Sequence, residues 1–267
     1  MTKRITICAD DFGMSNNINQ AIIKLLDKKI INATSCMVNM PEFKTGIDKL
    51  KKIYNNFINV GLHLNLTEGK SLTQSKSLTK NSLFLSLPKL LIKSQFRLIS
   101  YNDAYTELKA QIEEFIKYWG DVPDFIDGHQ HIHQFPAIRK ALINLYQEFK
   151  MHNKKTYIRS TYNMQKTDLK SIIIYYSGAK QLQKLLIKNN IRHNTSFAGI
   201  YSLAKKKNFR RVIIHAYQNI TDGGLIMCHP SIAIDTKDAI SHSRVQEFRY
   251  FSSQQALQDQ GEHYIFL

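Results

Sequence analysis

Acidic and imidazole side chains occur at several places in this 267-residue chain where they could carry out chemistry. One is a pair of adjacent aspartates, Asp10 and Asp11, directly after an apolar run that ends at Ala9. Two carboxylates are costly to bury in part unless a cation or hydrogen bonds compensate them. A metal would supply that compensation, with one carboxylate coordinating and the other free to accept a proton from water. The alternative is that the pair stabilises the positive end of a helix that follows Ser15.

The segment DGHQHIH at residues 127–133 contains the most candidate ligands. If it stays extended, alternation places four side chains on one side of a strand, namely those of Asp127, His129, His131 and His133. Neutral imidazole is a common metal ligand, and Asp127 could orient one of the rings. A structural or solvent-exposed histidine cluster is the alternative. The spacing does not select which ring would bind a metal.

Two isolated histidines complete the set. His63 shares one face of an apolar run with Asn65, so it is either a ligand or a satisfied core residue. His229 ends another apolar run and suits a separate role, such as proton donation to a leaving group, although an exposed loop histidine is the alternative. Further on, Arg244 and Glu247 are spaced to form a local ion pair on one helix.

Short β-type runs alternate with helix-length patterns along the chain. The patterns predict strands at residues 4–9, 33–38, 57–64, 125–133, 156–159, 225–228 and 264–267. They predict helices after Ser15, at 44–54, at 101–119, and from Pro136 to about residue 149. Strands separated by helices imply parallel pairing with right-handed crossovers. The expected fold class is therefore α/β, either a β/α barrel or a doubly wound sheet.

Both architectures place the active site at the carboxyl ends of the strands. The aspartate pair, His63, the 127–133 segment and His229 each follow a predicted strand. They are therefore expected to converge at one rim, and this convergence predicts a metal-dependent hydrolase. Residues 72–100 interrupt the alternation, so they are either an insertion that covers the site or a surface excursion without a role.

Composition limits the class of protein. The chain is 43% hydrophobic and 22% charged, which is typical of a globular protein, and its length favours one domain over residues 1–267. The first residues lack a signal-peptide pattern, and no apolar run is long enough to cross a bilayer. Each cysteine (Cys8, Cys36 and Cys228) lies in an apolar run. Buried free thiols are therefore expected, as is a location in the cytoplasm.

The net charge of +16 arises from 37 basic against 21 acidic residues. It fits a solvated basic surface or an anionic partner such as nucleic acid, an acidic membrane or an anionic substrate. The densest basic group comprises Lys205 to Lys207 with Arg210 and Arg211. No RNA-binding pattern accompanies this group, so no specific nucleic-acid partner is expected.

Four motifs in order resemble the YdjC-like carbohydrate deacetylases, which include chitooligosaccharide deacetylases. They are ADDFG at 9–13, GLHL at 61–64, DGHQHIHQFP at 127–136 and MCHP at 227–230. The resemblance runs from residue 4 to about 250, although residues 160–220 match little of the pattern. It implies a single-domain variant (β/α) barrel of the polysaccharide-deacetylase type and removal of acetyl groups from N-acetylated sugars or oligosaccharides. It also implies that the chain could form a homodimer.

The resemblance further implies roles for individual residues. Asp11, His63 and His129 would hold one divalent cation, Mg²⁺ or Zn²⁺. Asp10 would be the general base and His229 the general acid.

Three other residues are implied to act around this centre. His131 and His133 would line the substrate pocket or support the ligands, and Arg159 would contact substrate or orient Asp10. Two other functions stay open. A metal-dependent phosphoesterase or amidohydrolase also uses His-x-His at a strand end, usually on the first strand. A non-catalytic binder of an anionic polymer would bind in a steeply salt-dependent way that survives metal removal.

Overall fold

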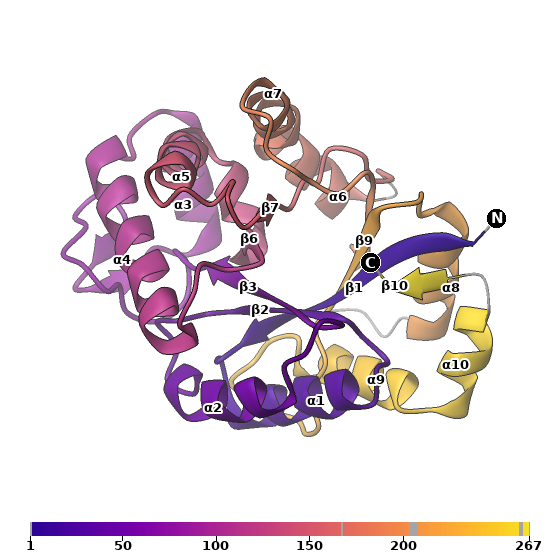
Figure 1. Ribbon diagram of the computed structural model, residues 1–267. Helices are drawn as coiled ribbons and strands as arrows, with labels where there is room; N and C mark the ends of the chain where they lie inside the picture. Colours follow the sequence, from indigo (N-terminus) through magenta and orange to yellow (C-terminus); the bar gives the residue numbers. More distant parts are fainter. Residues whose placement is uncertain (1, 167, 203–207, 262–263, 267) are drawn as a thin grey trace.

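A computed structural model describes residues 2–166, 168–202, 208–261 and 264–266. The basic group Lys205 to Lys207 and the last residue of the predicted final strand, Leu267, lie outside these residues. Strands occupy the centre of the molecule and helices surround them (Figure 1). The chain therefore has the α/β architecture expected from its sequence.

The central sheet is parallel, with the hydrogen-bonded order β7-β6-β3-β2-β1-β9-β8, and β10 pairs with the start of β1. Its strands are β1 (Lys3–Phe12), β2 (Ala33–Cys36), β3 (Asn59–Leu64), β6 (Phe125–Gly128), β7 (Tyr157–Ile158), β8 (Phe197–Ala198), β9 (Gly224–Cys228) and β10 (Tyr264–Phe266). A separate antiparallel hairpin consists of β4 (Thr79–Lys80) and β5 (Leu83–Phe84).

The helices fill the connections between strands. They are α1 (Asn16–Asp27), α2 (Phe43–Ile53), α3 (Leu87–Gln95), α4 (Tyr101–Trp119), α5 (Pro136–Glu148), α6 (Leu169–Ile174), α7 (Lys180–Lys188), α8 (Phe209–Asn219), α9 (Ser241–Phe251) and α10 (Gln254–Gln260). Two irregular helical segments are the 3₁₀ segment η1 (His129–Gln134) and the π-helical turn η2 (Tyr175–Ala179).

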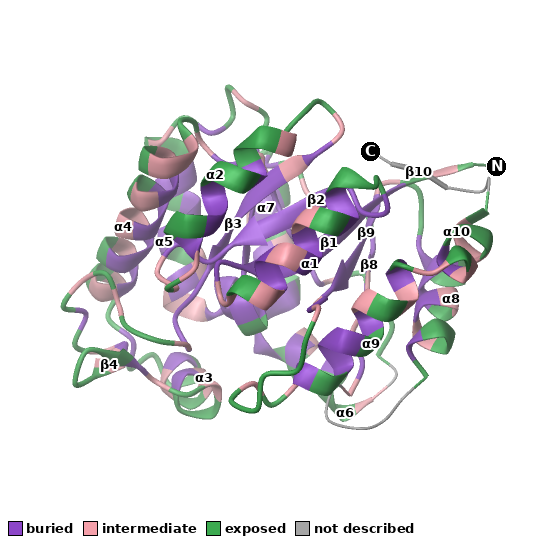
Figure 2. Ribbon diagram, turned by 90° about the horizontal axis from the view of Figure 1, so that it is seen from below, coloured by how far each residue is buried: buried purple, intermediate pink, exposed green. Residues whose placement is uncertain are grey.

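Local sequence explains why these elements form. The Ser15 hydroxyl accepts a hydrogen bond from the Ile18 amide at 3.3 Å, so Ser15 caps α1 as its sequence predicts. Helix α1 buries Ile18, Ile22 and Leu25 against the sheet. The central strands are buried along their length, as Figure 2 shows, because helices cover the sheet.

The barrel has a seam between its edge strands, β7 and β8. Apart from a single bridge between Met164 and Phe197, no ladder joins the two sides in the described part of the chain. Instead, the Ile158 amide donates to the Arg192 carbonyl at 2.9 Å, and the Ser160 amide donates to Asn194 Oδ1 at 2.8 Å. The fold is therefore a variant barrel that loop contacts close.

The strand predicted at 125–133 is wrong beyond Gly128. Residues 129–134 turn into η1, in which Gln130 and His131 have φ values of 53° and 61°. The turn depends on a close approach, because a Cβ at Gly128 would lie 2.9 Å from the backbone nitrogen of His133. Alternation therefore does not place His129, His131 and His133 on one side of a strand.

Two bulk predictions can be compared with the structure. Cys8, Cys36 and Cys228 are free and buried, as expected. Within the residues that the structure describes, no helix is both long enough and apolar enough to cross a membrane.

Candidate active site

A cavity of about 470 Å³ lies at the carboxyl ends of β1, β3, β6 and β9. Six of the predicted site residues line it: Asp10, Asp11, His63, His129, His131 and His229. The convergence inferred from strand ends is therefore confirmed as an arrangement in space. The remaining lining includes apolar side chains from the connections, among them Leu87, Leu169 and Ile173.

The aspartate pair lies in an irregularity of β1 and not in a loop after it. Strand β1 continues to Phe12, and its register with β2 shifts between Ala9 and Phe12. At Asp11 the backbone has a φ of 72°, in the left-handed region. Adjacent residues of a regular strand point to opposite faces, whereas this irregularity lets both carboxylates reach one cavity.

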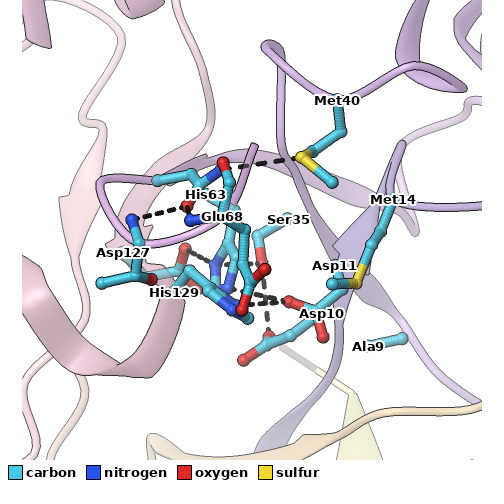
Figure 3. A network of polar contacts seen from close by, with 12 residues as sticks. Ala9, Asp10, Asp11, Met14, Ser35, Met40, His63, Glu68, Asp127 and His129 are labelled. Carbon is cyan, nitrogen blue, oxygen red and sulfur yellow. Dashed lines mark hydrogen bonds and ion pairs between the residues drawn. The ribbon is translucent and has the colours of Figure 1, made fainter. Parts of the chain in front are cut away.

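Three side chains meet at one point of the cavity wall (Figure 3). Oδ1 of Asp11 lies 2.9 Å from Nδ1 of His129 and 3.3 Å from Nε2 of His63. The three ligand atoms all lie within 4.8 Å of one another, and all three residues are buried. One carboxylate and two imidazoles directed at a common point form a donor set suited to a divalent cation with open coordination positions. The residues implied by the resemblance therefore fit a metal.

His63 is held from its other ring nitrogen. Its Nδ1 lies 2.6 Å from Oδ1 of Asp127 and 3.0 Å from the hydroxyl of Ser35. A carboxylate behind an imidazole is typical of the support that orients a metal ligand. Burial lowers the pKa of His63, but the carboxylates of Asp127, Asp11 and Asp10 outweigh it and raise the pKa to about 10. The surroundings of His63 thus favour a positive charge, which a bound cation would provide in place of a proton.

Asp10 is held by a bidentate ion pair. Both Nη atoms of Arg159 lie 2.7 Å from its carboxylate oxygens, and Nη2 also lies 2.6 Å from Oδ2 of Asp127. Burial would raise the pKa of Asp10, but the charge and hydrogen bonds of Arg159 dominate and hold it below its usual range. Arg159 is fully buried and does not line the cavity. Its geometry fits the orienting role and not contact with substrate.

Cys8, Asp10 and Asp127 form a second group of possible ligand atoms. The Arg159 guanidinium pairs with both carboxylates of this group. The positive charge of the Arg159 side chain therefore already compensates the two carboxylates of this group.

The other two histidines of the 127–133 segment, His131 and His133, lie in different places. His131 lines the cavity, whereas His133 lies behind it, with Nε2 3.0 Å from the Arg159 carbonyl. Burial lowers the pKa of both rings, that of His133 to about 4. Nδ1 of His131 is buried and has no hydrogen-bond partner in the described residues. His131 therefore presents its ring to the cavity while its Nδ1 is covered by protein, and His133 is placed to support Arg159.

His229 reaches the cavity from the end of β9. Its backbone amide donates to the Glu247 carboxylate, which also accepts from the Tyr201 hydroxyl. Burial lowers the pKa of His229 to about 4, and it raises the pKa of the fully buried Glu247 to about 7. Nδ1 of His229 has no partner among the described residues. A pKa of about 4 favours the neutral ring at pH 7, and the ring lines the cavity.

The local ion pair predicted between Arg244 and Glu247 is wrong. Arg244 instead donates from Nη2 to Oδ2 of Asp11 at 2.7 Å and from Nε to Oδ2 of Asp238 at 2.5 Å. Burial opposes ionisation of Asp11, but Arg244 and His129 outweigh it and hold the pKa of this carboxyl well below its usual range. The side chains of Arg244 and Glu247, both on α9, point inward because they pair with Asp11 and with the His229 amide at the cavity wall.

Sequence patterns did not assign several residues that build the site. They singled out neither Ser35 nor Tyr201, and they predicted only a local ion pair for Arg244 and Glu247. Ser35 lies near the carboxyl end of β2, so the strand-end rule that selected His63 could have selected it. The other three leave no such signal, since their contacts join segments that only the folded chain brings together.

Comparison with known proteins places the chain in a family. The family model described as YdjC-like protein matches residues 4–260. The chain belongs to the YdjC-like family. This YdjC-like chain is 26% identical over 233 residues to a chitooligosaccharide deacetylase of Yersinia enterocolitica, covering 86% of this chain and 83% of that protein. It is 27% identical to a carbohydrate deacetylase of Clostridium beijerinckii, covering 99% and 97%.

A shorter match and a solved structure complete the comparison. A protein named carbohydrate deacetylase 2 from Listeria innocua is 33% identical over 148 residues, which span 57% of that protein. A crystal structure from Enterococcus faecalis V583, of a protein proposed to cleave cellobiose phosphate, superposes with a TM-score of 0.76. That match covers 100% of this chain and 97% of that chain at 20% identity, so it supports the fold alone.

Proposed function

We propose that this YdjC-like protein is a metal-dependent hydrolase that removes acetyl groups from N-acetylated sugars or oligosaccharides. The observation that carries the proposal is the meeting of Asp11, His63 and His129 on the wall of a cavity that Asp10 and His229 also line. Matches over most of their length to proteins named as chitooligosaccharide and carbohydrate deacetylases support the reaction and the substrate class.

The metal ligands in this proposal are Asp11, His63 and His129. A divalent cation held there would polarise the amide carbonyl and make water more acidic. Two imidazoles and one carboxylate are typical of Zn²⁺ sites, but Mg²⁺ and other divalent ions also accept part of this set. Metal analysis of the purified protein is needed to identify the ion.

Asp10 is the proposed general base. Its lowered pKa keeps it ionised at neutral pH, which is the form that accepts a proton from water. Arg159 fixes the direction of this carboxylate through two hydrogen bonds of 2.7 Å. The same pairing makes Asp10 a weaker base than a free aspartate.

His229 is the proposed general acid. A ring with a pKa of about 4 is neutral in the resting site, so it must first take up a proton from solvent in the cavity before it can protonate a departing amine. The charges of Asp11 and Asp10 act to raise this pKa. Charge that develops on the substrate during attack would act in the same direction and so favour protonation of His229.

The cavity suits a small polar ligand with an apolar part. Its volume of about 470 Å³ lies in the range of small-molecule sites. The imidazole rings of His131 and His229, which line the cavity, could bind polar groups of a sugar. Leu87 and Met227 add apolar surface to the lining. Segment 72–100, which contributes Leu87, is proposed to act as an insertion over the site.

The test is acetate release from a panel of N-acetylated mono- and oligosaccharides by the metal-reconstituted protein. The wild type should release acetate only with metal, and Asp11→Ala should release none. Asp10→Asn should retain metal and lose turnover, which separates the base from the ligands. Metal-dependent hydrolysis of phosphate esters without acetate release would instead favour the phosphoesterase hypothesis. Salt-sensitive polymer binding that survives chelation would favour a non-catalytic role.

The cytoplasmic location and the homodimer stay predictions. Fractionation of the native cells tests the location, and light scattering of the purified chain tests the dimer.

A further inference from the structure

Exposed apolar side chains gather beside the cavity. In the described part of the chain, seven of the thirteen exposed large hydrophobic residues lie in just two segments, 92–98 and 169–176. We call these seven the apolar rim: Ile92, Phe96, Leu98, Leu169, Ile172, Ile173 and Tyr176. Scattered exposed apolar residues are ordinary, whereas a concentration of them marks an interaction surface.

The two segments of the apolar rim adjoin each other. Nε2 of Gln95, the last residue of α3, donates to the Ser177 carbonyl of η2 at 3.2 Å. Phe96 and Tyr176, which flank these two residues, are 74% and 73% exposed. Figure 2 shows α3 and α6 along the same edge of the molecule. The apolar rim is therefore one surface built from two distant parts of the sequence.

This surface borders the entrance to the active-site cavity. Leu169 and Ile173 belong both to the apolar rim and to the cavity lining, and Leu87 at the start of α3 lines the cavity as well. A partner that covers the apolar rim therefore meets the entrance to the site.

The charged residues within the two rim segments are basic. Residues 92–98 contain Lys93 and Arg97, and residues 169–176 contain Lys170, with Asp168 immediately before them. Apolar side chains interspersed with lysines are typical of surfaces that lie on anionic bilayers. A second copy of this chain would bring two basic surfaces together, and its net charge of +16 opposes that association.

We propose that the apolar rim docks on an anionic lipid surface. The rim side chains enter the headgroup region, the neighbouring lysines contact lipid phosphates, and the cavity entrance faces the bilayer. This docking does not depend on the reaction that the site catalyses.

The test is co-sedimentation of the full chain with vesicles of phosphatidylcholine alone or mixed with phosphatidylglycerol in equal parts. We expect binding to the mixed vesicles, weak binding to phosphatidylcholine alone, and loss of binding when salt rises from about 0.1 M to about 1 M. Phe96→Ser and Tyr176→Ser should each weaken binding about tenfold, because each removes an apolar side chain that would enter the lipid. Leu257→Ser on α10, 56% exposed and outside the apolar rim, is the matched control and should bind as wild type.

Two further measurements keep the outcomes distinct. Acetate release from a water-soluble N-acetylated sugar should be unchanged in Phe96→Ser and Tyr176→Ser, since neither side chain lines the cavity. Binding without any acetate release would leave the docking intact and remove the proposed function. No binding to either vesicle, or equal binding by the rim variants, would overturn the docking. A dimer in light scattering that Phe96→Ser dissociates would assign the apolar rim to a second copy and also overturn it.

Discussion

The two sides of the barrel hold their functional groups by different means. On the side of β1, β2, β3 and β6, strand register places them: His63 of β3 lies directly opposite Asp127 of β6. On the other side, β7 and β8 have two residues each, and His229 follows β9. Its backbone is held by Glu247, a side chain of α9.

The difference shows which groups have fixed positions. A group placed by parallel ladders can move only if several backbone hydrogen bonds change. His229 lies one residue beyond the β1–β9 ladder, which ends at Cys228, so its backbone depends in addition on one contact and on the charge state of Glu247. We therefore expect substitution of the proposed metal ligands on the first side to abolish metal binding, and substitution of His229 on the second side to alter rate and pH dependence.

The largest effect is expected for Asp11→Asn. Asparagine tolerates the left-handed backbone at this position, where φ is 72°, so the change removes the charge and leaves the turn. Metal content should fall to trace levels and acetate release by at least about a thousandfold, because the proposed Lewis acid is lost. Asp222→Asn, which alters an exposed pair with Arg4, is the control and should keep both. Full metal content in the Asp11 variant would contradict the ligand assignment.

His229→Ala tests the second side of the barrel. Loss of a general acid typically lowers kcat by about 10² to 10⁴-fold, while the ligands on the first side should keep the metal. Steady-state kinetics and metal analysis measure the two effects separately. If kcat changes by less than about tenfold, the proton comes from another group.

Arg159→Met is expected to act on stability. It leaves Asp10 and Asp127 without their buried cation, and breaking a buried pair costs about 3–5 kcal/mol. Urea unfolding should report this loss. Arg4→Met removes an arginine from an exposed pair with Asp222, which solvent screens, and should leave the unfolding curve essentially unchanged. Equal losses of unfolding free energy in both variants would show that burial does not make the Arg159 ion pairs more stabilising than an exposed pair.

The smallest effect is the pH dependence of Glu247. Its pKa is 4.5 in the unfolded reference and about 7 when buried, so the folded chain keeps a proton that the unfolded chain releases. This contribution to stability is fully present below pH 4.5 and is lost as pH rises to about 7, a change of about 3 kcal/mol. Unfolding of the wild type and Glu247→Gln across this range should differ by that slope. Parallel curves would contradict the raised pKa.

The sequence predicted well the site residues on the side of β1, β2, β3 and β6. Buried strands with polar residues at their ends marked Asp10, Asp11 and His63, and parallel topology made their meeting at one rim a necessary consequence. Asp127 was expected to orient one of the three histidine rings of its own segment, but it contacts His63 of β3 instead. The metal and catalytic roles of these residues stay predictions.

The second side was harder to predict because its contacts are not periodic. Periodicity suggested an extended strand through residue 133, but the close packing of His133 on Gly128 bends the chain after β6. Helical spacing suggested a pair between Arg244 and Glu247, but the buried Asp11 carboxylate and the His229 amide are their partners. A buried partner from a distant segment outweighs a local surface pair.

The seam between β7 and β8 has a consequence for divergence within the family. The chain from Arg159 to Phe197 crosses from one edge to the other without a continuous ladder, so adding or removing residues there shifts no strand register. The same stretch carries α6, whose Leu169 and Ile173 line the cavity. Length changes in this stretch would therefore reshape the cavity entrance while the carboxylate and histidine centre stays as it is.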